Sequence, residues 1–189
     1  MTARLGLLGD LHAEDERLAA ALALFARERC DAILFVGDIV DGVGDVDRCV
    51  ALLQASRAIG VRGNHERWLL DDTMRTLPDA HRREDLLPQT VAFLRGLPPT
   101  RTLATPMGPL LLCHGVGDDD MQRLRQDDVG YGLQSNTPLA RVMQDRSCTV
   151  MVGGHTHHRA VRRFSAREVL GRGDSSLLYV NAGTLAPTD

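Results

Sequence analysis

The sequence predicts an α/β fold, and two features carry this prediction. Short apolar runs of strand length recur along the chain, and segments of helical period separate the early ones. Strand and helix therefore alternate in the N-terminal half, which favours parallel β-α-β units. Further along, the pattern changes to short strands joined by turns, and the closing strands, from residue 150 onward, are predicted to be hairpin-like and antiparallel. The main buried strands are expected at residues 5–8, 32–36, 59–61, 110–113, 149–152 and 177–180.

Two helices are predicted between the first three strands, because apolar residues recur there at helical spacing. Asp45 stands before the second helix and is positioned to cap its N-terminus. The apolar faces consist of Leu18, Leu22 and Phe25 in the first helix and Val46, Val50 and Leu53 in the second.

After the third strand, helices are expected at residues 66–75 and 89–95, and Leu97-Pro98-Pro99-Thr100 ends this helical stretch. A polar segment, residues 117–136, precedes Thr137-Pro138, which begins another helix by the rule that proline follows a cap. The remaining short strands are expected at residues 101–104, 150–153, 160–164 and 168–170, in addition to residues 177–180.

Length and composition are those of an ordinary globular protein. The 189 residues fit one domain, residues 1–189, and 43% are hydrophobic and 25% charged. A net charge of −3 gives no electrostatic support for binding nucleic acid. The four cysteines have no CxxC spacing, which favours reduced thiols. The longest apolar stretch, residues 18–26, is half a membrane span. We therefore expect a cytoplasmic protein without a membrane segment.

Five short fragments from distant parts of the chain together carry the side chains of a metal-binding site. Each offers carboxylate, amide or imidazole groups, and each follows an apolar run that is typical of a strand. In open α/β sheets, ligands bind beyond the carboxyl ends of the strands, so these fragments are expected to converge. Asp38 follows His12 by 26 residues and His65 follows Asp38 by 27, about one strand-helix unit each time. The fragments are Gly9-Asp10-Leu11-His12, Gly37-Asp38-Ile39-Val40-Asp41, Gly63-Asn64-His65-Glu66, His114-Gly115 and Gly154-His155-Thr156-His157.

The donor set predicts two divalent metal ions as cofactors. Carboxylate, imidazole and one amide, without thiolate, suit manganese first, with iron or zinc as alternatives, and suit magnesium less well. Two such ions about 3.5–4 Å apart can hold a hydroxide between them and clamp phosphoryl oxygens during in-line attack. The pattern therefore indicates cleavage of a phosphoester.

The order of these fragments resembles the calcineurin-like metallophosphoesterase superfamily, from Gly9 to Gly183, and within it the small bacterial phosphodiesterase-like branch. The resemblance implies a two-sheet mixed β-sandwich flanked by helices, in four layers. It implies Asp38 as the carboxylate that bridges two metals and His65 as the catalytic histidine that protonates the leaving alkoxide. The other implied ligands are Asp10, His12 and His157 for the first metal, and Asn64, His114 and His155 for the second.

Asp41 stands three residues beyond Asp38, where related phosphatases keep an aspartate that orients the catalytic histidine. A carboxylate on one ring nitrogen would raise the pKa of His65 and leave the other nitrogen as a proton donor. The alternative is a turn-capping aspartate before Gly42.

The residues near these motifs have simpler interpretations. His158 is expected at the surface or rim, and His81 on a solvated helix. The run Asp118-Asp119-Asp120 is expected in a solvated loop, and Trp68 in the core. Two arginines that flank the third motif, Arg62 and Arg67, could meet substrate phosphate but need not face the site.

Departures from the superfamily pattern narrow the function. The serine/threonine phosphatases of the superfamily have an arginine at the position of Gly42 and a glycine at the position of Val116. These two differences disfavour a protein phosphatase. The segment Asn181-Ala182-Gly183-Thr184 resembles the C-terminal motif of the small phosphodiesterase-like members. We expect hydrolysis of a phosphodiester or a small phosphomonoester. The alternatives are a nucleotide polyphosphate hydrolase, or a non-catalytic scaffold like the retromer subunit, which is missing the catalytic histidine. Neither the substrate nor the oligomeric state follows from the sequence.

Overall fold

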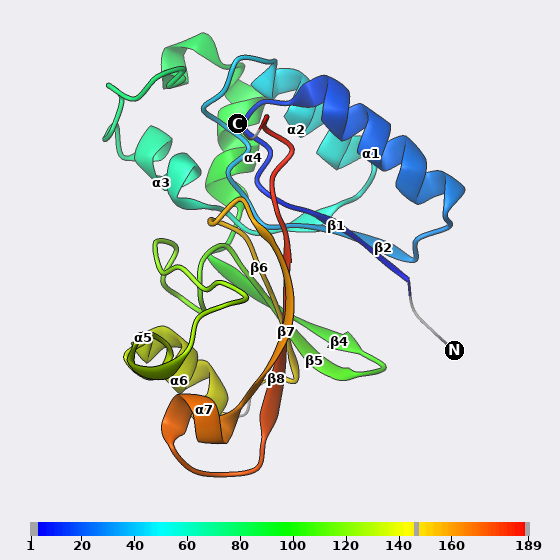
Figure 1. Cartoon of the computed structure of the whole chain (residues 1–189). Coiled ribbons are helices and arrows are strands. Elements are labelled where there is room, and N and C mark those ends of the chain that lie inside the picture. The colour runs from blue at the N-terminus through cyan, green and yellow to red at the C-terminus, as the bar shows by residue number, and fades with distance from the viewer. Residues whose placement is uncertain (1–3, 146–147, 188–189) are drawn as a thin grey trace.

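The computed structural model describes residues 4–145 and 148–187. Its helices lie on the outer sides of two β-sheets, and the sheets face each other across an apolar layer (Figure 1). This confirms the α/β fold that the sequence pattern predicted and the two-sheet arrangement flanked by helices that the resemblance implied.

The first sheet has three parallel strands in the order β1-β2-β3. Leu5 pairs with Ala32, and Leu34 pairs with Ile59, so neighbouring strands run in the same direction. Helices connect consecutive strands, which confirms the predicted parallel β-α-β units. The elements are β1 (Leu5–Leu8), α1 (Asp15–Arg27), β2 (Ala32–Phe35), α2 (Val46–Ala55), β3 (Ile59–Gly60), α3 (Asn64–Leu70) and α4 (Pro88–Gly96). A short 3-10 helix spans Arg83–Asp85.

Apolar faces hold α1, α2 and α4 against the outer side of this sheet. Leu18 of α1 and Leu53 of α2 are fully buried there, and Phe35 of β2 packs into the same cluster. The Asp45 side chain accepts a hydrogen bond of 2.9 Å from the Arg48 backbone N–H, which confirms the predicted N-cap.

The second sheet has five strands in the order β4-β5-β6-β8-β7. The β4–β5 and β7–β8 pairs are antiparallel, the latter as predicted, but β6 is parallel to both β5 and β8. The prediction of antiparallel pairing for the closing strands was therefore wrong for β6, because α5 and α6 form a crossover between β5 and β6. The elements are β4 (Thr100–Thr105), β5 (Gly108–Cys113), α5 (Gly130–Gln134), α6 (Thr137–Asp145), β6 (Val150–Gly153), β7 (Arg159–Ser165), α7 (Ala166–Leu170) and β8 (Ser176–Ala182).

Two predicted elements were wrong in type or length. Residues 168–170 were expected as a strand but belong to α7. Ser165 and Glu168 form a capping box, and this local signal outweighs the β-branched content of a three-residue run. The helix expected at residues 66–75 ends at Leu70, and the chain then turns through Asp72, whose φ of 57° is left-handed.

The two sheets pack against each other through β-branched and leucine side chains. Val36 and Val61 from the first sheet region meet Leu112 and Val152 from the second. A separate cluster, including the fully buried Phe164, covers the other side of the second sheet beneath α5, α6 and α7. The layers are therefore helix, sheet, sheet and helix.

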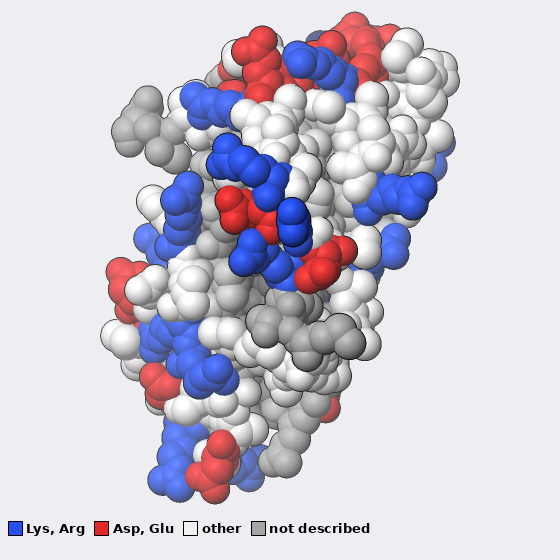
Figure 2. Space-filling view, turned by 90° about the vertical axis from the view of Figure 1, so that its right-hand side faces the viewer, with Lys and Arg blue, Asp and Glu red and all other residues white. Residues whose placement is uncertain are grey.

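The molecular surface mixes charges of both signs. Figure 2 shows arginine and acidic side chains next to one another on one face, without a broad patch of a single sign. Within the described residues, no helix has the length and apolar character needed to cross a membrane. All four cysteines are free thiols, as predicted.

Candidate metal centre

The seven predicted metal ligands lie just beyond the carboxyl ends of strands from both sheets. Asp10 and Asp38 follow β1 and β2, and His114 follows β5 directly. The two sheets are joined at this edge, because the His114 ring nitrogen Nδ1 lies 2.8 Å from the Val36 carbonyl oxygen. Segments that are far apart in sequence therefore meet at a single place.

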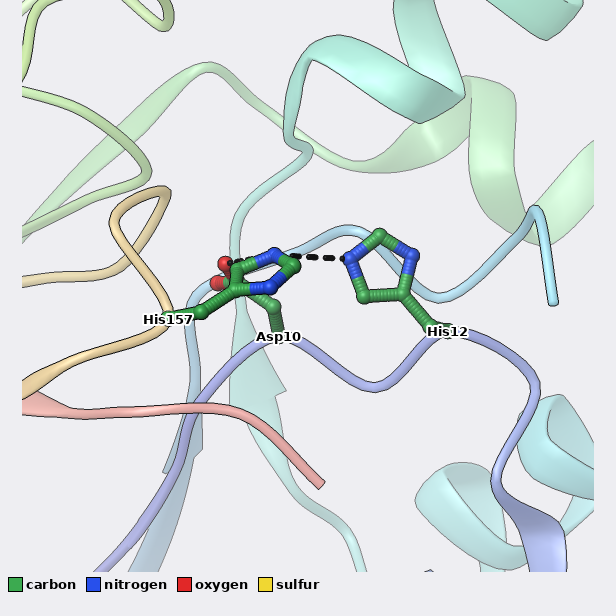
Figure 3. Close-up of side chains that lie close together, drawn as sticks. All are labelled: Asp10, His12 and His157. Carbon is green, nitrogen blue, oxygen red and sulfur yellow. Dashed lines mark hydrogen bonds and ion pairs between the residues drawn. The ribbon is translucent and has the colours of Figure 1, made fainter. Parts of the chain in front are cut away.

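Asp10, His12 and His157 form the first group of possible ligands, with one ligand atom from each lying within 4.8 Å of the others. The two histidine rings point toward each other beside the carboxylate, and their Nε2 atoms are 3.0 Å apart (Figure 3). Nε2 of His157 also lies 3.2 Å from Oδ2 of Asp10. That buried oxygen has no hydrogen-bond partner among the described residues. A cation fits between these three atoms.

Asp38, His114 and His155 form the second group. Nε2 of His114 lies 3.1 Å from Oδ2 of Asp38 and 2.9 Å from Oδ1 of Asn64. Nε2 of His155 is buried and has no hydrogen-bond partner within the described residues. An unpaired buried nitrogen is costly in a folded protein unless it binds something.

Asp38 connects the two groups. Its carboxylate also belongs to a third group of possible ligands, together with His12 and His65. The side chain therefore lies between the two clusters, where a single carboxylate can reach two ions.

The electrostatics of the centre favour bound positive charge. Burial would lower the pKa of His114, but the charge of Asp38 raises it to about 10. Burial would raise the pKa of Asp38, yet the neighbouring histidines hold it well below its usual value. The buried carboxylate of Asp38 thus stabilises a proton on His114, so the site favours positive charge. Divalent metal ions bound there would supply that positive charge in place of the proton. Burial and His114 lower the pKa of His155, which favours the neutral imidazole that a metal needs.

Backbone carbonyls orient two of the rings. Nδ1 of His12 lies 2.8 Å from the Asp41 carbonyl oxygen, and Nδ1 of His114 lies at the same distance from the Val36 carbonyl. With Nδ1–H donating to a carbonyl, the lone pair of Nε2 is left for a metal.

Five residues of this edge have left-handed backbone conformations, which residues other than glycine rarely adopt. Such conformations cluster at functional sites, where the surrounding structure enforces them to aim side chains. The φ angles are 46° for His12, 47° for Asp38, 66° for Asp41, 65° for His155 and 59° for His157.

Two glycines make room for the ligands. A Cβ atom at Gly63 would overlap the Asp38 carboxylate and approach the His114 ring to 2.8 Å. A Cβ atom at Gly154 would overlap Oδ1 of Asp10. The motifs therefore need glycine at these positions so that backbone and ligands can approach closely.

His65 and Asp41 form a pair at the edge of the metal groups. Nδ1 of His65 lies 2.7 Å from Oδ2 of Asp41, and its Nε2 lies 4.0 Å from Oδ2 of Asp38. Burial would lower the pKa of His65, but the hydrogen bond to Asp41 and the charge of Asp38 raise it. Burial would raise the pKa of Asp41, but hydrogen bonds from His65 and Arg75 lower it.

The sequence interpretation missed two residues that hold Asp41. Arg75 donates from its two terminal nitrogens to both Asp41 oxygens at 2.9 Å, and its side chain is only 9% exposed. The prediction of a solvated helical position for His81 was wrong. Its backbone N–H donates to Asp41 and its Nδ1 accepts the Asp41 N–H, because the chain after α3 folds back over this turn. A single sequence carries no periodic signal for such a contact.

Glu66 acts as a buried clamp for the same turns. Its carboxylate accepts backbone N–H groups from Asp38, Ile39, Val40 and Gly63 at distances of 2.6–3.2 Å. Burial and the charge of Asp38 raise the pKa of Glu66 to about 7, while the backbone donors oppose this shift. The third motif contains Glu66, but its spacing alone did not reveal that it ties two ligand-bearing turns together.

The other residues near the motifs lie either beside the candidate site or at the surface. The Trp68 ring is half-buried against the His65 ring, with centroids 4.7 Å apart. Arg67 donates two hydrogen bonds to the Asp120 carboxylate, at 2.7 and 2.8 Å, so one residue of the acidic run is paired rather than fully solvated. His158 is exposed, as predicted.

Solved structures share this fold. A metallophosphoesterase from Sphaerobacter thermophilus has a TM-score of 0.72 at 21% identity, covering 100% of this chain and 80% of its own. A putative diadenosine tetraphosphatase has a TM-score of 0.59 at 18% identity, covering 98% and 85%. The phosphoesterase Yfce from E. coli has a TM-score of 0.51 at 20% identity, covering 95% and 79%. A search of curated proteins finds no significant match.

The family comparison covers nearly the whole sequence. The family model described as the calcineurin-like phosphoesterase superfamily domain matches residues 3–189. Members of this superfamily are phosphoester hydrolases that typically bind divalent metals, which agrees with the three clusters of possible ligands. The chain therefore belongs to the calcineurin-like phosphoesterase superfamily.

Proposed function

We propose that this protein is a dinuclear metal-dependent phosphoesterase that hydrolyses a phosphodiester or a small phosphomonoester. One observation carries the proposal. The third group of possible ligands overlaps the first through His12 and the second through Asp38. It also includes His65, which pairs with Asp41. This arrangement combines binding of two cations with a positioned proton donor.

Seven side chains would hold the two ions, with Asp38 shared between them. The ligands for one ion are Asp10, His12 and His157, and those for the other are Asn64, His114 and His155. When bound, the ions neutralise charge on the phosphoryl oxygens and lower the pKa of water, which supplies a nucleophile at neutral pH. The donor chemistry favours manganese, with iron or zinc as alternatives.

His65 is the general acid in this proposal. Because Nδ1 is engaged by Asp41, the proton for the leaving group resides on Nε2, which faces the metal groups. The carboxylate raises the pKa of the ring, which favours the protonated form that can give its proton to the leaving oxygen. Asp41 and Arg75 fix the ring orientation.

Two other functions share this geometry. A nucleotide polyphosphate hydrolase would use the same metals, and one structural neighbour is named a putative diadenosine tetraphosphatase. A non-catalytic scaffold would keep the fold, and another neighbour is a Vps29 variant. The presence of His65 and of all seven ligands favours catalysis over the scaffold.

The test is an activity panel with added Mn²⁺ on the purified protein. The panel spans monoesters, diesters, cyclic nucleotides and dinucleoside polyphosphates, with the Asp38→Asn variant as the control. Hydrolysis of esters by the wild type alone supports the proposal. A panel without turnover, at full metal occupancy, would leave the scaffold as the better account.

A further inference from the structure

A hollow of about 410 Å³ opens beside the second group of metal ligands. His114 contributes to its wall, so the hollow is continuous with the candidate metal centre. Its walls come from the chain before α3, from the segment after β5 and from α6. Three arginines, Arg62, Arg67 and Arg141, face it together with the acidic run Asp118-Asp119-Asp120 and with Pro99 and Pro138.

The formal charges of this hollow balance, with three arginines and three aspartates, but only one arginine and one aspartate form an ion pair within the described residues. The guanidinium of Arg67 donates two hydrogen bonds to the Asp120 carboxylate. The carboxylate of Asp119 accepts the backbone N–H groups of Met121 and Gln122 at 2.9 and 3.0 Å. Asp118 is exposed to solvent at the rim.

Arg62 and Arg141 differ from these residues. Neither guanidinium has an ion pair or a hydrogen bond among the described residues, although their backbones are firmly held. The Arg62 N–H donates to the Pro98 carbonyl oxygen at 3.0 Å, next to the turn that carries Asn64. Arg141 stands on α6, whose other face is buried through Leu139 and Val142. Both guanidinium groups are therefore available to an anion.

We propose that Arg62 and Arg141 bind a second phosphate group of the substrate, next to the phosphate held at the metal centre. The inference rests on the proposed function and narrows its substrate class to molecules that carry at least two phosphate groups. Guanidinium groups bind phosphate oxygens through paired N–H donors, and a dianionic group offers enough acceptors for both arginines. The exposed carboxylate of Asp118 at the rim repels other anionic groups, so the site accepts a compact anion rather than an extended anionic surface.

The experiment measures binding without turnover. Methylene-, ethylene- and propylenebisphosphonate are titrated by calorimetry into the Mn²⁺-loaded protein, and each is compared with the monophosphonate of the same carbon length. Fluorescence of Trp68, the only tryptophan in the chain, gives a second readout because its ring lies against His65. In the wild type, at least one bisphosphonate should bind about 10–100-fold more tightly than its monophosphonate.

The gain in affinity should depend on the two arginines. Arg62→Gln combined with Arg141→Gln should remove most of the ratio between bisphosphonate and monophosphonate affinity. If the bisphosphonates bound more tightly only because they chelate the metal ions, the double variant would keep the wild-type ratio. Arg27→Gln, which removes an exposed arginine from α1, is the matched control and should keep the wild-type ratio.

The outcomes separate this inference from the proposed function. An unchanged ratio in the double variant overturns the inference, even if the protein hydrolyses simple esters. A lost ratio supports the inference, and hydrolysis of p-nitrophenyl phosphate by the wild type tests the proposed function independently. If the double variant does not fold, Arg141→Gln alone decides the question, since this side chain is exposed and its loss leaves the core of α6 intact.

Discussion

Nδ1 of His65 lies 2.7 Å from Oδ2 of Asp41, and both Asp41 oxygens also accept hydrogen bonds from Arg75. One carboxylate therefore connects the candidate proton donor to a nearly buried arginine from a different segment. The position of His65 and its affinity for a proton both depend on this contact.

Replacing Asp38 should damage metal binding more than replacing any other single ligand. Its carboxylate belongs to two of the three groups of possible ligands, so Asp38→Asn removes negative charge from both ion positions. We expect the variant to lose most of both metals, whereas Asp10→Asn should lose mainly one. Elemental analysis of the purified proteins decides between these results. Full occupancy by two metals in Asp38→Asn would contradict the shared position.

The role of His65 as general acid predicts a dependence on the leaving group. His65→Ala should reduce kcat by roughly 10²–10⁴-fold for alkyl phosphoesters, which need a proton on the leaving oxygen. The loss should be smaller for p-nitrophenyl esters, because p-nitrophenolate leaves without a proton. His158→Ala, at an exposed histidine, is the matched control. Equal losses across leaving groups would mean that His65 positions the phosphate instead.

The pH profile should shift in opposite directions in two variants. A general acid must be protonated, so kcat falls as the pH rises through the pKa of His65, which Asp41 raises. Asp41→Asn removes that partner, lowers the pKa of His65 and should move the alkaline limb of kcat to lower pH. Arg75→Gln leaves the Asp41 charge less compensated, so the limb should move to higher pH. Shifts of the same sign in both variants would rule out this coupling.

Glu66 should matter for stability more than for chemistry. Glu66→Gln places an amide N–H₂ group against backbone N–H donors and leaves two of them without an acceptor. We expect the free energy of unfolding to fall by about 2–6 kcal/mol, since each of the two unsatisfied buried donors costs about 1–3 kcal/mol. Denaturant unfolding measures the change. Glu16→Gln, on the exposed side of α1, should have little effect, and equal stability of both variants would refute the clamp.

The sequence by itself determined the parallel β-α-β half, the cap at Asp45 and the set of possible metal ligands. These features are local or periodic: hydrophobic spacing reports which face of an element is buried, and glycine-bounded motifs report where strands end. Because the carboxyl ends of parallel strands share one edge, the motifs had to converge, and in the structure the predicted ligands do lie together.

Only the tertiary structure decided the contacts between segments that carry no shared pattern. Arg75 and His81 reach Asp41 because the chain after α3 folds back, and Glu66 joins the turns after β2 and β3. The direction of β6 likewise depends on a crossover through α5 and α6 rather than on its own residues. Such contacts are set by packing between elements distant in sequence, so no local propensity encodes them.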